Sequence, residues 1–385
     1  MFEAVDTSTM PRRDPILIAC VFLLTGLGLV TLFSSSYAYA DRFFNNGMYF
    51  ISRQGIYCAV GILLYIVASR INLETIRKFI KPFIIVSLIL CVLTFIPGIG
   101  VVRNGASRWI RLGVFTYQPS EMVKLILPLY LAHILDKKKD MLAVFSSGVL
   151  PPVLVTASFF ILIYLQNNFS TAVFIVVNAL VIFFLAGIRL RYFIAATFIF
   201  MPLSVLLLLS KEHRVRRLIS YIQPNWEPQG AGYQVKNSLL AISSGGFFGK
   251  GIGQGTRKIS SVPEVHSDFI FTAFSEEMGF LGVMLFMALL AVFAVHGYRA
   301  AQNSGSVYRK LLCVSLVTTI VSQTLLNIAV VSGSLPATGI PLPFFSAGGS
   351  SLMTTLISAG LIVNISRART DEASRYSPLE ENIYG

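Results

Sequence analysis

Ten apolar stretches recur along the chain between Ile16 and Val363, and most approach the ~20 residues that a helix needs to cross a bilayer. They cover residues 15–36, 49–69, 80–97, 121–135, 145–165, 169–187, 191–210, 270–297, 311–331 and 349–366. Hydrophobic residues make up 55% of the sequence and charged residues 13%, about half the charged share of an ordinary soluble domain. The sequence therefore predicts an all-α polytopic membrane protein with about ten transmembrane helices.

Basic residues between these stretches indicate the orientation. With the N-terminus in the cytoplasm, the clusters near residues 70–78, 137–139, 189–191, 299–310 and 367–369 all fall on the cytoplasmic side, as the positive-inside rule requires. An even number of spans also places both termini there. Residues 1–14 are then a cytoplasmic N-terminus, residues 15–366 the membrane domain and residues 367–385 a cytoplasmic tail. These clusters account for the net charge of +13, which therefore does not indicate nucleic-acid binding.

Two segments on the outer side are unusual. Arg103, Arg108 and Arg111 break the charge rule, which indicates either a functional segment or an amphipathic surface segment with Trp109 at the interface. The extracytoplasmic loop at residues 211–268, between the seventh and eighth spans, is long enough to indicate a function. Within it, the glycine-rich residues around Lys250 are either a flexible turn or a cradle for an anion such as a lipid-borne pyrophosphate.

Acidic residues near the membrane have two interpretations each, because charge is costly there. Asp268, just before the eighth span, is either a helix N-cap or a catalytic carboxylate. His266 is either a proton carrier or metal ligand or an ordinary loop histidine. Glu276 and Glu277 are adjacent on a helix and point about 100° apart, so at least one of them is expected to have a structural partner.

Two further patterns concern the fourth and tenth spans. Glu121 and Lys124 are three residues apart on one helix face, within reach of an ion pair. Proline and glycine residues are dense between Pro336 and Gly349, just before the last span. Broken backbone at membrane depth is tolerated only when protein buries it or it lines a polar cavity. This segment therefore indicates a substrate cavity or a structural re-entrant loop.

Taken together, these stretches resemble the RodA/FtsW family of shape, elongation, division and sporulation proteins across nearly the whole chain. The matching pieces are Asn104-Gly105-Ala106-Ser107-Arg108-Trp109-Ile110, Gln118-Pro119-Ser120-Glu121 with Lys124, Gly232-Tyr233-Gln234, Ser244-Gly245-Gly246, Pro263-Glu264 with His266, Asp268-Phe269-Ile270-Phe271, Glu276-Glu277 and Gly348-Gly349-Ser350-Ser351.

The resemblance implies a glycan polymerase of the bacterial cytoplasmic (inner) membrane that acts on lipid II and works with a class B penicillin-binding transpeptidase. It implies that Asp268 is catalytic. It also implies a substrate site that includes Arg108, Arg111, Glu121, Lys124, Glu264, His266 and Ser350.

The chain departs from the family pattern at two positions. Asn168 stands where the family usually has an aspartate, so no role of that aspartate transfers to this chain, and Ala347 replaces an aromatic residue. Residues 232–282 and the paired serines are more similar to FtsW, the division member, which would place the protein at the septum. Pro341-Leu342-Pro343 is more similar to RodA, the elongation member.

The implied reaction is formation of a β-1,4 bond, in which a sugar hydroxyl attacks an anomeric carbon and undecaprenyl pyrophosphate leaves. Asp268 is the expected base, or a ligand for a divalent cation such as Mg²⁺ or Mn²⁺. Two other functions fit a chain of this kind. A flippase or transporter for the lipid precursor also has intramembrane charges and broken helices, and a non-enzymatic division scaffold would not need a carboxylate at position 268.

Overall fold

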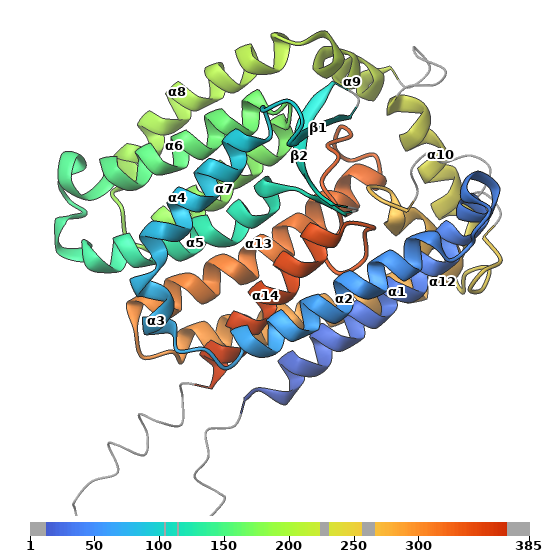
Figure 1. The fold of residues 1–385 in the computed structure, drawn as a ribbon, viewed down its shortest axis with the longest axis horizontal. Helices are drawn as coiled ribbons and strands as arrows, with labels where there is room; N and C mark the ends of the chain where they lie inside the picture. The colour runs from blue at the N-terminus through green and yellow to red at the C-terminus, as the bar shows by residue number, and fades with distance from the viewer. Residues whose placement is uncertain (1–12, 104, 114, 224–230, 256–265, 368–385) are drawn as a thin grey trace, which may run out of the picture.

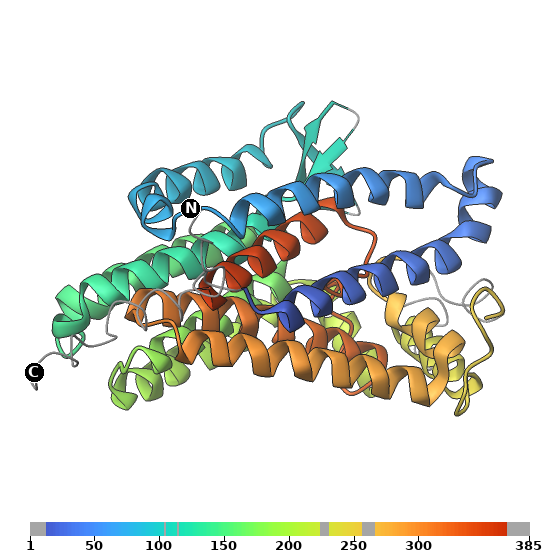
Figure 2. The ribbon, with the colours of Figure 1, turned by 90° about the horizontal axis from the view of Figure 1, so that it is seen from below.

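The computed structural model describes residues 13–103, 105–113, 115–223, 231–255 and 266–367. Each of the ten predicted spans falls on one helix: α1 (Pro15–Phe44), α2 (Tyr49–Ala68), α4 (Ile80–Leu93), α5 (Pro119–Lys137), α6 (Leu150–Leu165), α7 (Phe169–Leu185), α8 (Leu190–Leu209), α12 (Ile270–Gln302), α13 (Val307–Val331) and α14 (Gly349–Ser366). The helices run alongside one another down the long axis of the molecule (Figure 2). Short helical pieces, α3 (Leu73–Lys78), Lys139–Met141 and Phe145–Val149, lie between them.

Helix length and hydropathy confirm a helical multi-pass membrane protein. Among the described residues, seven helices are long and apolar enough to cross a membrane: α1, α2, α8, α12, α13, α14 and the helix that includes α6. α4 and α7 are apolar but shorter. α5 carries Glu121, Lys124, Asp136 and Lys137 on a mostly apolar sequence, and the first three of these charges have partners inside the protein.

α14 lies at the centre of the bundle and packs against α1, α2, α5, α12 and α13. Small residues permit its close approach to α2, as is common between membrane helices. A Cβ atom on Gly360 would lie 2.6 Å from the carbonyl oxygen of Tyr65, and one on Gly61 would lie 2.6 Å from Leu356 Cδ1. α8 is the opposite case, because it has no buried residue along its length.

The two ends of the described chain meet on one face. The Asp14 side chain caps α1 by accepting hydrogen bonds from the amides of Ile16 and Leu17. The Asp14 amide donates to Ser366 Oγ at the end of α14, at 3.2 Å. Both ends therefore lie together at the lower left of Figure 1, as an even number of spans requires. α1 begins at Pro15 and α14 ends at Ser366.

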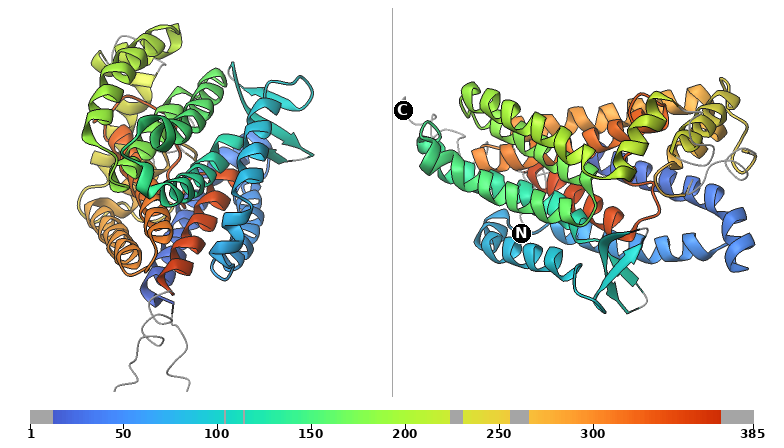
Figure 3. Two further views of the ribbon diagram at one scale, coloured as in Figure 1. Left: turned by 90° about the vertical axis from the view of Figure 1, so that its left-hand side faces the viewer. Right: turned by 90° about the horizontal axis from the view of Figure 1, so that it is seen from above.

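The outer segment around Trp109 is a small antiparallel sheet, which the sequence did not predict. Its strands pair in the order β1 (Gly100–Arg103), β2 (Ala106–Leu112) and β3 (Phe115–Tyr117). Valine and aromatic residues favour strands here, and Gly105 and Gly113 supply positive φ angles of 72° and 61° between them. The sheet lies at the margin of the helical bundle (Figure 3).

The long loop predicted at residues 211–268 contains two helices, α9 (Glu212–Ile222) and α10 (Ala231–Ser244). α10 packs against α12, and α9 contacts α8 and α10. Glu264, a predicted substrate residue, lies outside the described residues.

Candidate active site

A cavity of about 920 Å³ lies at the end of the bundle that holds the α1–α2 turn, opposite the end at which α1 begins. Its walls come from the α1–α2 turn, the β-sheet, the start of α5, the α6–α7 turn, α9, the residues before α12 and the segment before α14. Asp268, Arg108, Glu121, His266 and Ser350 all line it, so the fold brings together five of the predicted site residues from distant parts of the chain.

Asp268 is positioned by hydrogen bonds to its own backbone carbonyl and to those of the two preceding residues, and it is not the N-cap of α12. α12 begins at Ile270 and its N-cap is Phe269, so the N-cap interpretation of Asp268 is wrong. The side-chain amide of Asn327 donates to the Asp268 carbonyl at 2.9 Å. Just upstream, Ser346 Oγ donates to the Ser267 carbonyl at 2.7 Å and the Ala347 amide to the His266 carbonyl at 3.0 Å. α13 and the segment before α14 thus set the position of this carboxylate.

His266 packs between aromatic rings rather than among charges. Its ring centroid lies 4.3 Å from that of Phe50 and 5.1 Å from that of Tyr39. Burial lowers the pKa of His266 to about 4, so the ring is neutral at physiological pH. The described residues contain no group of three His, Cys, Asp or Glu side chains that could hold a metal ion by themselves.

Four arginines line the cavity, Arg53, Arg103, Arg108 and Arg217, against two carboxylates, Asp268 and Glu121. Arg108 donates a short hydrogen bond to the Asn167 carbonyl. Burial, with the nearby charges of Arg217 and Arg214, lowers the pKa of Arg108 to about 10, while Asp268 acts in the opposite direction. The guanidinium therefore stays charged, and the cavity carries an excess of positive charge suited to an anionic ligand.

Arg53 and Arg217 were missed by sequence reasoning, although weak signals existed. Arg53 interrupts the apolar second span, and an intramembrane charge is a functional hypothesis by default. Arg217 lies on α9, where basic and apolar residues alternate. Nothing in the sequence indicated that these two residues face the same cavity as Arg108.

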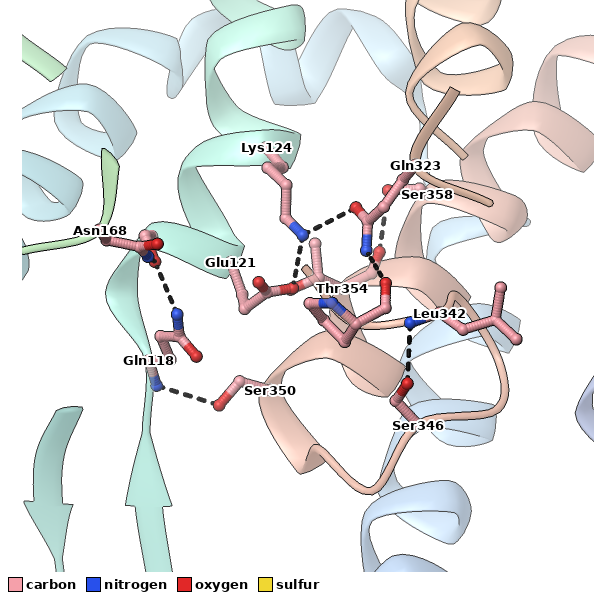
Figure 4. Close-up of polar contacts among 12 residues, drawn as sticks. Gln118, Glu121, Lys124, Asn168, Gln323, Leu342, Ser346, Ser350, Thr354 and Ser358 are labelled. Atoms are coloured by element: carbon pink, nitrogen blue, oxygen red, sulfur yellow. Dashed lines mark hydrogen bonds and ion pairs between the residues drawn. The ribbon is translucent and has the colours of Figure 1, made fainter. Parts of the chain in front are cut away.

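Two predicted substrate residues do not line the cavity. Arg111 is exposed on β2. Lys124 is buried, forms a 2.8 Å ion pair with Glu121 and donates to Gln323 Oε1 at 2.8 Å (Figure 4). Gln323 Nε2 in turn donates to the Pro341 carbonyl at 2.7 Å. The predicted ion pair is confirmed, and it ties α5 to α13 and to the proline-rich segment.

Ser350 and Asn168 connect the walls of the cavity. Ser350 Oγ, in the first turn of α14, accepts a hydrogen bond from the Gln118 amide at 3.0 Å (Figure 4). Asn168 is buried and its side chain donates to Ser120 Oγ at 3.4 Å. The residue that replaces the family aspartate thus has a structural partner at the start of α5.

The glycine-rich loop does not line the cavity. The amides of Lys250 and Gly251 donate to the carbonyls of Glu276 and Glu277 at 3.1 and 3.0 Å, and Lys250 Nζ lies 2.8 Å from Glu276 Oε1. Glu277 accepts from Ser34 Oγ and from the Gly253 amide. The loop binds carboxylates of its own chain, which supports the turn interpretation and gives both glutamates a structural role.

The fold and the cavity define a class of protein: a helical multi-pass membrane protein with an arginine-rich cavity that holds a carboxylate at one end of its bundle. Comparison with known proteins narrows the class. The family model of FtsW, RodA and SpoVE, described as cell cycle protein, matches residues 14–371. The chain belongs to this family.

Relatives match it over nearly its full length. It is 37% identical over 362 residues to a probable peptidoglycan glycosyltransferase FtsW of Geobacter sulfurreducens, covering 94% of this chain and 97% of that protein. It is 36% identical over 361 residues to stage V sporulation protein E of Bacillus subtilis, covering 94% and 99%.

Solved structures share the fold. A chain from a peptidoglycan synthase complex, described as coordinating polymerization and crosslinking, matches with a TM-score of 0.76 at 26% identity and covers 95% of this chain and 99% of that chain. The rod shape determining protein RodA of Thermus thermophilus matches with a TM-score of 0.69 at 25% identity, covering 93% and 97%.

Proposed function

We propose that this protein is a peptidoglycan glycosyltransferase that polymerises lipid II into glycan strands. The single observation that carries the proposal is the cavity in which Asp268 lies among four arginines at one end of a membrane bundle. A lipid-linked substrate needs a site at the membrane boundary, its pyrophosphate needs cations, and its sugar hydroxyl needs a base. Family membership and the named activity of the FtsW relatives support the same conclusion.

In the proposed reaction the 4-hydroxyl oxygen of one lipid II attacks the anomeric carbon of the growing glycan. The bond from that carbon to the pyrophosphate oxygen breaks, and undecaprenyl pyrophosphate leaves with the bonding electrons. Asp268 takes the hydroxyl proton as the new bond forms, a step worth roughly 10² to 10⁴ in rate. Arg108 and the other cavity arginines stabilise the charge on the leaving group.

A divalent cation is compatible with this site only with help from the substrate. The described residues hold no set of three candidate metal ligands. Mg²⁺ or Mn²⁺ would therefore bind through Asp268 and phosphate oxygens of lipid II, as Mg²⁺ commonly does, and would add positive charge at the leaving group.

We place the protein in cell division, with ten helices crossing the membrane and both termini in the cytoplasm. FtsW proteins among its relatives support the division role. A class B transpeptidase is the proposed partner, since a solved structure of similar fold comes from a synthase complex that coordinates polymerization and crosslinking. Co-purification in mild detergent should recover the transpeptidase. A fully active protein without such a partner would contradict this part of the proposal.

The decisive experiment replaces Asp268 by asparagine and measures polymerisation of purified lipid II. Asp268→Asn should abolish polymer formation without lowering thermal stability, because asparagine keeps the size of the side chain and cannot accept the proton. Asp140→Asn, at an exposed position outside the cavity, is the matched control and should remain active. Normal polymerisation by Asp268→Asn would remove the carboxylate from the mechanism.

Two further outcomes separate the alternatives. If wild-type protein moves lipid II between leaflets but makes no glycan with transpeptidase and divalent cation supplied, the flippase function replaces ours. If excess Mn²⁺ restores activity to Asp268→Asn, the carboxylate mainly holds a cation, because metal concentration does not replace a missing base.

A further inference from the structure

One wall of the cavity is built from aromatic rings at the α1–α2 turn. Phe44 is the last residue of α1, and Tyr49 and Phe50 are the first two of α2. The Phe44 and Tyr49 rings are stacked, with centroids 4.1 Å apart and planes 3° apart. The Phe50 ring stands at 85° to both of them, at 5.8 and 5.2 Å. All three residues line the cavity, and we call them the aromatic wall.

The turn between the helices fixes the orientation of this wall. α1 ends at Asn45, which has a positive φ of 49° and donates its amide to the Asp41 carbonyl. Asn46 then accepts two bonds, one from the Met48 amide on its side chain and one from the Tyr49 amide on its carbonyl, both at 3.0 Å. The rings are therefore presented by a hydrogen-bonded turn.

The wall extends to His266, which is close in sequence to the proposed base. The Phe50 ring lies 4.3 Å from the His266 ring, and His266 precedes Asp268 by two residues. His266, Ser267 and Asp268 line the same cavity. A ligand that contacts Asp268 therefore occupies the same cavity as the aromatic wall.

The polar groups around the wall indicate what it binds. The Arg53 guanidinium lies 4.6 Å from the centroid of the Tyr49 ring, whose other face is stacked on Phe44, and Gln54 and Asp268 share the cavity. Phe44, which is 45% exposed, therefore supplies the accessible aromatic face of the stacked pair. A sugar ring has an apolar C–H face that packs on an aromatic face and polar edges that hydrogen-bond to neighbouring groups. An isoprenoid chain has no polar edges, so contact with it would remove water from the Arg53 guanidinium without offering a hydrogen-bond acceptor in return.

We propose that Phe44, Tyr49 and Phe50 form the carbohydrate subsite of the cavity and hold a sugar ring of the lipid-linked substrate beside Asp268. The inference rests on the proposed function, because it takes the substrate to be lipid II. It assigns Phe44, Tyr49 and Phe50 to substrate binding, and it leaves the proton transfer to Asp268.

The test measures binding of two probes to the full-length protein in lipid nanodiscs. One probe is lipid II, and the other is undecaprenyl pyrophosphate, which has the same lipid and pyrophosphate without the sugars. Phe44→Ala should weaken lipid II binding by about fivefold to tenfold, the loss expected for one aromatic contact, and should change binding of undecaprenyl pyrophosphate by less than about twofold. Phe44→Tyr keeps the ring and should bind both probes like the wild type.

Phe43→Ala is the matched control, because Phe43 is the neighbouring aromatic residue, is 62% exposed and does not line the cavity. It should bind both probes normally. In polymerisation assays Phe44→Ala should raise KM and leave kcat nearly unchanged.

Equal loss of both probes in Phe44→Ala would assign the wall to the lipid or the pyrophosphate and overturn the inference. Unchanged binding of both probes would also overturn it. Failure of the proposed function is recognised separately, since the wild-type protein would then form no glycan from lipid II.

Discussion

A Cβ atom on Gly339 would lie 3.3 Å from Oδ2 of Asp268, and the backbone of Gly339 has a φ of +72°. The segment before α14 therefore approaches the proposed base so closely that only a residue without a side chain fits comfortably. Ser346 and Ala347 of the same segment also donate hydrogen bonds to the backbone carbonyls of Ser267 and His266. The segment therefore contacts the Asp268 side chain and positions the backbone that precedes it.

Gly339→Ala should reduce polymerisation of lipid II by about tenfold or more, because a small displacement of a reacting group costs a large factor in rate. Gly333→Ala is the control. Gly333 also has a positive φ, +70°, and its Cβ atom would also meet neighbours at 3.3 Å, but those neighbours are Leu239 and Val235. Both variants should lose about 1–2 kcal/mol of stability. Equal activity in the two variants would show that contact with Asp268 is unimportant.

Lys124 and Glu121 should be strongly coupled in stability. Lys124→Met leaves the buried Glu121 carboxylate without its 2.8 Å partner, which typically costs about 3–5 kcal/mol. The double variant Lys124→Met, Glu121→Gln removes both charges and should recover much of this loss. Thermal unfolding of the two single variants and the double variant measures the coupling energy. Additive losses would mean that the pair does not interact.

The neutral His266 should make the protein sensitive to acid. An unfolded chain protonates this histidine below about pH 6.5, whereas the folded protein does so only below about pH 4. The unfolded state therefore binds more protons between these values, and stability falls as the pH decreases from 6.5 to 4. The loss should reach about 1–3 kcal/mol at pH 4. His266→Gln should remove this part of the pH dependence, which thermal melts across the range would measure. An identical pH slope in the variant would count against a buried neutral ring.

Membrane topology can be tested with single cysteines at Lys139, in the predicted cytoplasmic loop, and at Gln254, in the predicted outer loop. Both residues are exposed, and all four native cysteines are buried. An impermeant thiol reagent should label position 254 in intact cells and position 139 only after lysis. Labelling of both positions in intact cells would rule out the ten-span arrangement.

Sequence reasoning worked best where the signal was local. Apolar stretches located the ten helices, and spacing along one helix predicted the pair of Glu121 and Lys124. It failed where the answer depended on residues far apart in the chain. The glycine-rich loop was suited to an anion, but its anions are Glu276 and Glu277 of the same chain. The cavity around Asp268 is also lined by Arg53, Arg217 and Tyr49, because separate parts of the fold converge there. No local sequence pattern predicts that convergence.

Asp14 and Ser366 are in contact at the two ends of the membrane domain, so the helices could be connected in a different order along the chain. Because the two ends of the membrane domain are joined by a hydrogen bond, a short linker from residue 367 to residue 13 would close the chain without stretching it. New ends could then be opened at Lys139–Met141, an exposed turn on the predicted cytoplasmic side. In such a circular permutant the last six spans would enter the membrane before the first four, while the central position of α14 and the walls of the cavity would be unchanged.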